Sequence, residues 1–194
     1  MSHADKEKWD RKYRQKPTLL QDRPASKLLQ RYAKEASGSV AIDLACGNGR
    51  NTLFLAKEGF HVDAVDISEV ALANLKEKVN GLDVQLIVCD LDDFIPEAGH
   101  YDLAVMTNYL DRALILRMAE ALKSGALFII ETYMAHPENE KKDSNPDFLL
   151  AKEELLAMFD KRGYEVLAYE EFLNEPHELY RMYKEAIVVK KRYR

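Results

Sequence analysis

The amino-acid sequence predicts an α/β fold, with a doubly wound, seven-stranded and mostly parallel sheet that has helices on both faces. Apolar segments with strand-like spacing alternate with segments of helical spacing, which favours a parallel sheet covered on both sides. Gly59, Gly81 and Gly163 each follow a helical segment and are suited to end it. The 194 residues fit one compact domain that can bury a sizeable core.

Two short helices are expected before the sheet begins. Amphipathic spacing places them around residues 9–14 and 25–34, and prolines separate them. We expect residues 1–36 to form a helical cap and residues 37–194 to form the main domain. Trp9 lies one helical turn before Tyr13, so the two rings are expected to pack together. They serve either as an anchor for the leading helix or as a lid over a ligand.

The elements of the main domain follow in order. Strands are expected at residues 40–44, 62–65, 84–88, 103–107, 126–131, 165–169 and 185–190. Helices are expected at residues 51–58, 69–79, 112–122 and 151–161, and Ser68 is a suitable N-cap for the second of them. The last two strands have a connection too short for a covering helix, so they should form an antiparallel hairpin. The charged segment 134–148 is expected to be a long functional loop.

Composition limits the classes of partner and location. A formal net charge of −5 argues against a nucleic-acid partner, because phosphate neutralisation requires a basic surface. The charged N-terminal segment lacks a signal-peptide core, and no apolar run reaches membrane-spanning length. Cys46 and Cys89 are expected to be reduced thiols. We therefore expect a cytoplasmic protein with no membrane partner, as a monomer or a homodimer.

A glycine-rich turn, Gly47-Asn48-Gly49, follows the first strand. Such a turn lets a ligand approach the backbone closely, and in open α/β sheets ligands bind beyond the carboxyl ends of the strands. A Walker loop would require G-x-x-x-x-G-K-[ST], which does not occur. A dinucleotide fingerprint would require a third glycine where this chain has Thr52. Pyrophosphate is therefore the weaker candidate ligand.

Acidic residues accompany this turn. Asp43 lies within the first strand, Asp66 ends the second, and Asp90 ends the third, so all three belong to the same edge of the predicted sheet. Three carboxylates suit a cation better than a phosphate. Asp66 follows the glycines by about 20 residues, the separation at which a carboxylate accepts hydrogen bonds from ribose hydroxyls. A ligand that combines a ribose, an adenine and a positive charge is S-adenosyl-L-methionine.

Four segments carry a family resemblance: AIDLACGNGRNTLFLA, VDAVDIS, VCDLDDF and YDLAVMTNYLDR, in that order. They resemble the class I S-adenosylmethionine-dependent methyltransferases. The stretch GNGRNTLFLAKEGFHV and the leading WDRKY are similar to the small bacterial tellurite-resistance-type methyltransferases. The resemblance implies a Rossmann-like fold, methyl transfer from S-adenosyl-L-methionine to a small-molecule acceptor, and S-adenosyl-L-homocysteine as product. A tellurite-like oxyanion or a thiol is the acceptor that it implies.

The resemblance also implies residues for the methionine part of the cofactor. Gly47 and Gly49 would flank it, Asp43 would lie beneath the loop, and Ala45 would belong to the same cofactor-binding group. Arg50 is either a surface residue or a ligand for the cofactor carboxylate. A cation in the first turn of a helix is mildly unfavourable against the helix dipole, which favours a role for it.

The adenosine part has its own implied residues. Asp66 would hold the ribose hydroxyls, Ile67 would pack on an adenine face, Asp90 would accept from the exocyclic amine, and the Leu91 amide would reach a ring nitrogen. Each has a structural alternative. Asp66 can begin an Asx-type turn into the helix capped by Ser68, Asp90 can belong to a solvated acidic turn, and Ile67 can be ordinary core.

The acceptor side is implied by the later motifs. Asn108 and Tyr109, at the end of the fourth strand, would border the methyl group. His177 and Arg181 would line the acceptor pocket, because the last hairpin of the family borders it, and with Tyr109 they form the expected catalytic set. Arg112 is a further cation that would attract an anionic acceptor.

No dedicated base is required for a soft anion. An oxygen or nitrogen nucleophile would recruit His177, Tyr109, Tyr133 or Glu131 for proton removal, and the sequence does not choose among them. His136 and His177 lack partners at metal-ligand spacing, so no metal site is expected.

Two other functions compete with methyl transfer. A nicotinamide-dependent oxidoreductase would use a Rossmann sheet, but the missing third glycine and the antiparallel ending count against it. A non-catalytic module would bind the cofactor, or its demethylated product, and regulate a partner. Turnover with any acceptor distinguishes this module from an enzyme.

Overall fold

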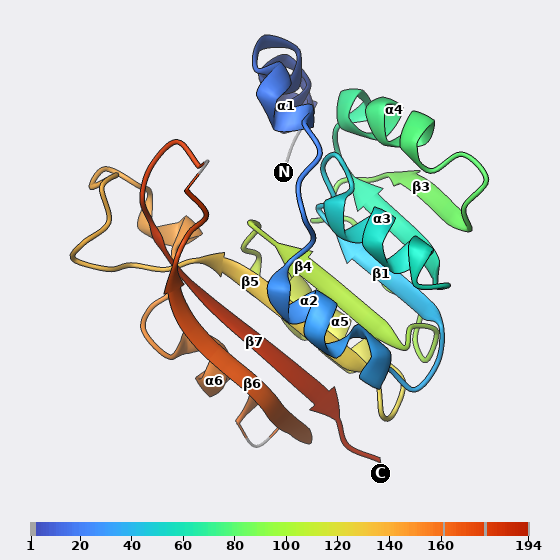
Figure 1. Ribbon diagram of the computed structural model, residues 1–194. Coiled ribbons are helices and arrows are strands. Elements are labelled where there is room, and N and C mark those ends of the chain that lie inside the picture. The colour runs from blue at the N-terminus through green and yellow to red at the C-terminus, as the bar shows by residue number, and fades with distance from the viewer. Residues whose placement is uncertain (1–2, 161, 177, 194) are drawn as a thin grey trace.

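One seven-stranded sheet forms the centre of the molecule (Figure 1). The computed structural model describes residues 3–160, 162–176 and 178–193. The strands are β1 (Val40–Leu44), β2 (His61–Asp66), β3 (Val84–Val88), β4 (Leu103–Thr107), β5 (Leu127–Tyr133), β6 (Tyr164–Leu173) and β7 (Tyr183–Lys191). Their spatial order is β3-β2-β1-β4-β5-β7-β6. The first five strands pair in parallel, whereas β7 is antiparallel to both β5 and β6. The predicted sheet and its antiparallel ending are confirmed.

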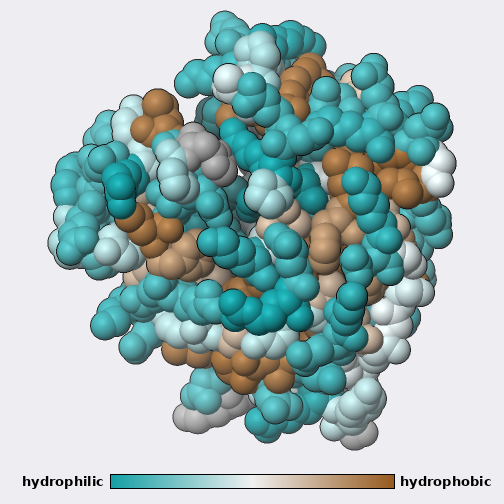
Figure 2. Space-filling model, viewed as in Figure 1, coloured by the Kyte–Doolittle hydropathy of each residue, from teal (hydrophilic) through white to brown (hydrophobic). Residues whose placement is uncertain are grey.

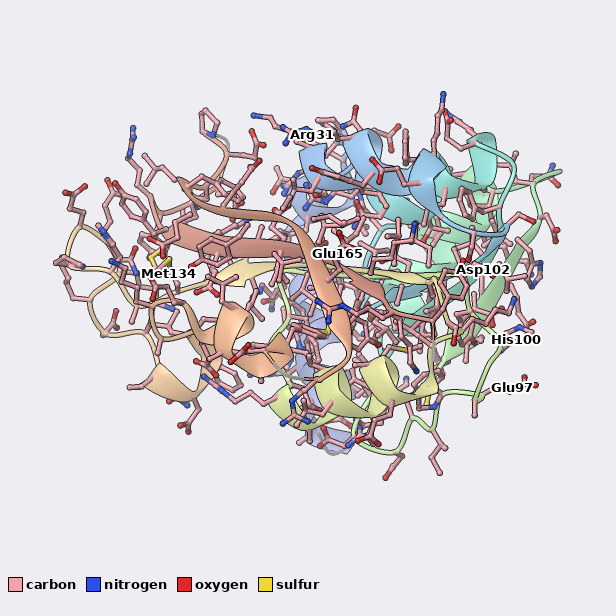
Figure 3. All side chains as sticks on the ribbon, turned by 90° about the horizontal axis from the view of Figure 1, so that it is seen from below. Arg31, Glu97, His100, Asp102, Met134 and Glu165 are labelled. Carbon is pink, nitrogen blue, oxygen red and sulfur yellow. The ribbon has the colours of Figure 1, made fainter. Side chains whose placement is uncertain are left out.

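Helices cover both faces of this sheet. They are α1 (His3–Gln15), α2 (Lys27–Tyr32), α3 (Arg50–Lys57), α4 (Glu69–Lys78), α5 (Arg112–Ala121) and α6 (Glu154–Phe159), with short 3-10 turns at Pro17–Leu20, Ala33–Glu35 and Pro146–Phe148. Figure 3 shows α2 and α3 on one side of the sheet and α5 and α6 on the other. Figure 1 shows α1 beside α4, beyond the end of the sheet. No helix among the described residues is long and apolar enough to cross a membrane.

The inner strands β1, β4 and β5 are buried on both sides. Every residue of β4 is buried, as expected for a parallel strand covered on both faces. One core lies between the sheet and α5 and α6, where Phe128 packs against Phe159. A second core lies under α2 and α3, and Leu29 is fully buried there. Helix α2 therefore contributes to the core that supports the sheet.

Several element boundaries differ from the sequence prediction. Strand β6 runs from residue 164 to 173, well beyond the expected 165–169, because it pairs along the whole length of β7. Helix α6 is shorter than the expected 151–161, because Glu153 adopts a left-handed φ of 60° and delays the helix start. Helix α1 extends on both sides of the expected 9–14. Hydrophobic spacing in the sequence shows neither how far two strands pair nor which backbone conformation a single residue adopts.

The carboxyl ends of the parallel strands define one edge of the sheet. Figure 3 shows Met134, which follows β5, and Asp102, which precedes β4, at opposite ends of the molecule. The glycine turn after β1 and the ends of β2 to β4 lie at the same edge as Met134, since these strands run in parallel. This edge is where a ligand is expected in an open α/β sheet.

The loop that follows β5 is held at its base. The buried side chain of Asn139 donates to the Met134 carbonyl at 2.8 Å and accepts from the Tyr183 amide at 2.7 Å. Leu150 also bridges to Met134. Although segment 134–148 has no long helix or strand, these contacts fix its course over the ends of β5 and β7.

Replacing Asn139 with alanine should lower the free energy of unfolding by about 2–4 kcal/mol. Two backbone groups would lose their partners in a buried place, and each loss costs about 1–3 kcal/mol. Urea denaturation followed by circular dichroism measures the change. Ser144→Ala in the same loop is the control and should stay within about 0.5 kcal/mol of the wild type. Equal changes in the two variants would contradict the role of Asn139.

Candidate active site

The glycine turn after β1 has a backbone that only glycine adopts easily. Gly47 has a φ of 55° and Gly49 a φ of 79°, and the Gly49 amide donates to the Cys46 carbonyl at 2.9 Å. A Cβ atom at Gly49 would lie 2.2 Å from Cδ1 of Leu75 in α4. A Cβ atom at Gly47 would lie 2.9 Å from the hydroxyl of Tyr13. The first glycine therefore lets Tyr13 lie close above the turn, and the second allows α4 to pack beside it.

Asp66 lies directly against this turn. Its Oδ2 accepts a hydrogen bond from the Gly47 amide at 2.8 Å, and its Oδ1 accepts from the Ser68 amide at 2.8 Å. The side chain is buried, and burial raises the pKa of Asp66 although both amides favour its charged form. The Asx-type turn into α4 and the placement beside the glycines are thus both present. The carboxylate and the glycine turn, which the sequence places at the same edge of the sheet, are in direct contact.

Asp43 lies beneath the turn, within the sheet. Its Oδ2 accepts from the amide and the hydroxyl of Thr52, at 3.0 and 2.7 Å. Its Oδ1 is buried without a hydrogen-bond partner among the described residues. Burial raises the pKa of Asp43 to about 7. Thr52, which occupies the place of a third glycine, therefore has a structural role, because it fastens the start of α3 to β1.

Two further residues at this edge have left-handed backbones. Ala45 after β1 has a φ of 54°, and Asn108 after β4 has a φ of 59°. Strands β1 and β4 are neighbours. Such conformations cost free energy in residues with a side chain, and they concentrate at functional sites. Ala45, expected near the methionine part of the cofactor, and Asn108, expected near its methyl group, therefore lie at the ends of adjacent strands.

The expected adenine side lies on the next strand. Asp66 pairs with Val88 in the sheet, and the Cys89 amide donates to the Asp66 carbonyl at 3.1 Å, so Asp90 follows immediately at the same edge. Oδ1 of Asp90 accepts from the Asp92 amide at 3.0 Å, as in an acidic turn.

Two apolar residues complete this side. Ile67 is half-buried. Leu91 is buried in the core, and its carbonyl accepts from Arg117 at 3.1 Å.

A buried chain of charged groups borders the other end of the site. Glu131, at the end of β5, lies 3.7 Å from Arg50 and 3.4 Å from Lys184. Lys184 also contacts Glu178 at 2.8 Å, and Tyr133 donates its hydroxyl proton to Glu178. The side chain of Lys184 is only 1% exposed, so it depends on these partners to remain in the protein interior. The chain links the start of α3, the end of β5 and the connection between β6 and β7.

This charged chain also restricts proton transfer. Burial raises the pKa of Tyr133 well above its usual value, so its phenol stays protonated. Burial disfavours the charge of Glu178, but Lys184 beside it lowers the pKa overall. In Arg50, Nη2 is buried and has no hydrogen-bond partner among the described residues. This nitrogen is the one that lies 3.7 Å from Glu131, so within the described part of the chain it has an ion-pair partner but no hydrogen bond, and it can still donate one to a ligand.

The expected catalytic residues are less closely grouped. Tyr109 is half-buried at the end of β4, and burial raises its pKa. Arg181 is exposed, and its backbone amide donates to Glu140 at 2.7 Å. His177 lies outside the described residues. The structure therefore brings Tyr109 to the sheet edge, and it ties the backbone of Arg181 to the loop after β5.

Arg112 is paired within the protein. Its guanidinium forms an ion pair with Glu154 and donates to the carbonyls of Asp147 and Leu149. It clamps the loop, so little of its charge is left for an anionic acceptor. Within residues 3–160, 162–176 and 178–193, no three His, Cys, Asp or Glu side chains are arranged to hold a metal ion.

Comparison with known proteins identifies the family. Residues 41–125 match the family described as a methyltransferase domain. The chain is 30% identical over 176 residues to the mouse N-terminal Xaa-Pro-Lys N-methyltransferase 1, covering 83% of this chain and 79% of that protein. The chain belongs to the class I S-adenosylmethionine-dependent methyltransferases. Its cofactor is S-adenosyl-L-methionine.

Other relatives of this methyltransferase agree on the fold and vary in the acceptor that their names state. It is 29% identical over 127 residues to the ribosomal protein L11 methyltransferase of Campylobacter concisus, covering 64% of this chain and 45% of that protein. The TehB structure from Haemophilus influenzae superposes with a TM-score of 0.75 at 23% identity, over 87% of this chain. This methyltransferase spans only 63% of that TehB chain. A methyltransferase structure from Methanosarcina mazei gives a TM-score of 0.69 at 16% identity, over 89% of this chain and 100% of that one.

The raised pKa of Asp43 predicts how stability depends on pH. The folded protein keeps a proton on this carboxyl that the unfolded chain, with a pKa near 3.8, loses. Asp43 therefore favours folding at low pH, and this contribution is lost as the pH rises to about 7. Linkage limits the loss to about 4 kcal/mol.

Asp43→Asn removes this titration, because an amide does not ionise in this range. Compared with the wild type, the variant should gain stability steadily as the pH rises from about 4 to about 7. Urea unfolding of the unliganded proteins at several pH values measures the difference. The exposed Asp143→Asn is the matched control and should follow the wild-type pH dependence. Parallel curves for wild type and Asp43→Asn would contradict the prediction.

Proposed function

We propose that this enzyme transfers the methyl group of S-adenosyl-L-methionine to a small-molecule acceptor. The observation that carries the proposal is the contact of Asp66 with the Gly47 amide at the carboxyl edge of the sheet. In Figure 2 the surface is indented between α1, at the top, and the loops that follow β5 and β6, at the upper left. A hollow bordered by three separate segments suits a compact acceptor.

The cofactor roles follow the order of the strands. Gly47 and Gly49 flank the methionine part, with Ala45 beside them. Nη2 of Arg50 lies 3.7 Å from Glu131 but makes no hydrogen bond with the residues described, and it suits the cofactor carboxylate because a guanidinium pairs well with carboxylate oxygens. Asp43 supports the turn from below through Thr52.

The adenosine part lies toward the outer strands in this proposal. Asp66 accepts hydrogen bonds from the ribose hydroxyls. It uses carboxylate lone pairs that are not taken by the amides of Gly47 and Ser68. Asp90 and Leu91, which follow β3, and Ile67, which follows β2, line the adenine position. Asn108 and Tyr109 border the methyl group.

The chemistry requires alignment more than activation. A sulfonium methyl group is already electrophilic, so the protein has to align nucleophile, methyl carbon and sulfur and to exclude water. Tyr109 and Tyr133 both have raised pKa values, which makes them hydrogen-bond donors and poor bases. Glu131 lies between the cations of Arg50 and Lys184, and its oxygens face these donors. This arrangement suits a thiolate or another acceptor that reaches the site already deprotonated.

A protein α-amine is the second candidate acceptor. The mouse relative is named for methylation of N-terminal Xaa-Pro-Lys sequences, and it matches most of this chain. Carboxylates at the site, including Asp66 and Glu131, would attract an ammonium group. Turnover assays separate the two candidates.

We also propose a cytoplasmic enzyme that is a monomer or a homodimer. Cys46 and Cys89 are both free thiols. Free thiols are typical of reducing compartments, which supports this location.

Cofactor binding is the first test. The wild type should bind S-adenosylhomocysteine in calorimetry, and Asp66→Ala should bind it at least tenfold more weakly, because about 1.4 kcal/mol or more of hydrogen bonding to a charged group is removed. Asp143→Ala, an exposed acidic residue in the loop, should bind like the wild type. Tight, saturable binding of NADH with none of S-adenosylhomocysteine would support an oxidoreductase instead.

Acceptor identity is the second test. Formation of S-adenosylhomocysteine is measured with oxyanions including tellurite, with thiols, with small amines, and with a peptide that begins Xaa-Pro-Lys. We expect turnover with a small acceptor, most readily a thiol, and none with the peptide. Turnover with the peptide alone would replace the proposal by protein N-methylation. Binding of the cofactor without turnover on any acceptor would favour a regulatory module.

A further inference from the structure

Helix α1 is fastened to the cofactor edge by a buried carboxylate. Asp10 is 5% exposed, and its Oδ1 accepts from the Ser68 hydroxyl at 2.7 Å and from the Val70 amide at 3.2 Å. The Ser68 hydroxyl in turn accepts from the Ala71 amide at 3.2 Å and caps α4. Asp10 therefore joins α1 to the start of α4, two residues after Asp66.

The second oxygen of Asp10 is paired separately. Lys6 donates to its Oδ2 at 3.3 Å and lies 3.3 Å from Glu69. Burial disfavours the charge of Asp10, but the hydrogen bonds from Ser68, Val70 and Lys6 hold its pKa below the usual value. The Asp10 carboxylate therefore stays charged at neutral pH and keeps these hydrogen bonds.

Tyr13 lies one helical turn beyond this fastening, above the glycine turn. Its hydroxyl is 2.9 Å from the position that a Cβ atom of Gly47 would occupy. The side chain is half-buried, and burial together with the charges of Asp66 and Cys46 raises its pKa, so the phenol remains a donor. The hydroxyl forms no hydrogen bond with any described residue. A phenolic donor is thus held against the turn without a partner.

The segment that follows α1 is also tied to the turn and to its neighbours. Asn48 donates to the Gln21 carbonyl at 2.8 Å, and the Ser26 amide donates to Asn51 at 3.0 Å. The N-terminal segment is therefore held on both sides of the glycine turn. Its position above the turn follows from specific contacts, and Tyr13 has a defined place there.

We propose that Tyr13 contacts the cofactor, donating a hydrogen bond to its amino-acid part above Gly47, and that Asp10 positions Tyr13 by fixing α1 on Ser68. The inference rests on the proposed function, because it assigns a residue to the same cofactor site. The amino-acid part is the partner because the Gly47 turn follows β1, whereas Asp90, expected at the adenine, follows β3 on the far side of β2. The carboxylate of the amino-acid part is the natural acceptor for a phenol that stays protonated.

Tyr13→Phe tests the contact with two ligands. S-adenosylhomocysteine carries the amino-acid part, whereas 5′-methylthioadenosine has the same nucleoside and thioether without it. The variant should bind S-adenosylhomocysteine about tenfold more weakly than the wild type, as expected for one hydrogen bond to a charged group. Its affinity for 5′-methylthioadenosine should be unchanged. Unchanged affinity for both ligands, or an equal loss for both, would overturn the assignment.

Two substitutions at Asp10 test the positioning role. Asp10→Asn keeps the Oδ1 acceptor for Ser68 and Val70, so it should bind S-adenosylhomocysteine within about twofold of the wild type. Asp10→Ala removes the acceptor and should weaken binding about as much as Tyr13→Phe. In the double variant Asp10→Ala with Tyr13→Phe, the losses should be less than additive, because both act through one contact. Arg11→Ala, an exposed residue on the same helix, is the control.

The outcomes separate this inference from the proposed function. If the wild type fails to bind S-adenosylhomocysteine, the proposed function is wrong. If the wild type and Asp10→Ala bind S-adenosylhomocysteine equally well, the proposed function is retained and the positioning role of Asp10 is rejected. Thermal unfolding of each variant shows whether a loss of affinity reflects unfolding, and Asp10→Asn serves as the folded reference if Asp10→Ala is unstable.

Discussion

The contact of the Asp66 carboxylate with the Gly47 amide is the constraint on which the site depends. It joins the end of β2 to the turn after β1, so the two strands present one continuous surface to a ligand. A buried carboxylate is unfavourable unless it is hydrogen-bonded, and here two backbone amides provide the bonds. The second amide belongs to Ser68, which begins α4 and receives α1 through Asp10. One side chain therefore sets the relative positions of two strand ends and two helices.

The sheet and the centre of the site could be predicted from the sequence because their signals are local. Strands buried on both faces appear as apolar runs, and the left-handed backbones of Gly47 and Gly49 require a residue without a side chain. The placing of Asp66 beside Gly47 followed from one topological rule, that parallel strands end at the same edge of a sheet. The length of β6 did not follow, because it depends on pairing with β7.

Lys184 and Asp10 could not be predicted as part of the site, because their roles depend on partners distant in the sequence. Lys184 lies between Glu131 and Glu178, and the sequence of β7 does not reveal which carboxylates this lysine will meet. Its place just before the apolar run of β7 is the sequence signal that could have indicated its burial. Asp10 is one of many charges in a charged helix, and nothing in the helix separates it from its exposed neighbours. Only the fold shows that it faces Ser68.

The charge state of the site explains why a cationic ligand suits it better than a phosphate. Burial raises the pKa values of Asp43 and Asp66, so each carboxylate is held in a place where its own charge is unfavourable. A ligand with a positive charge stabilises the ionised forms, and the ionised forms stabilise the ligand, since the two effects are one linkage. A pyrophosphate would add negative charge beside both groups and would raise their pKa values further. Thr52, which stands where a dinucleotide site has its third glycine, also disfavours a pyrophosphate. It keeps Asp43 hydrogen-bonded under the turn, and its side chain fills a place that glycine would leave open.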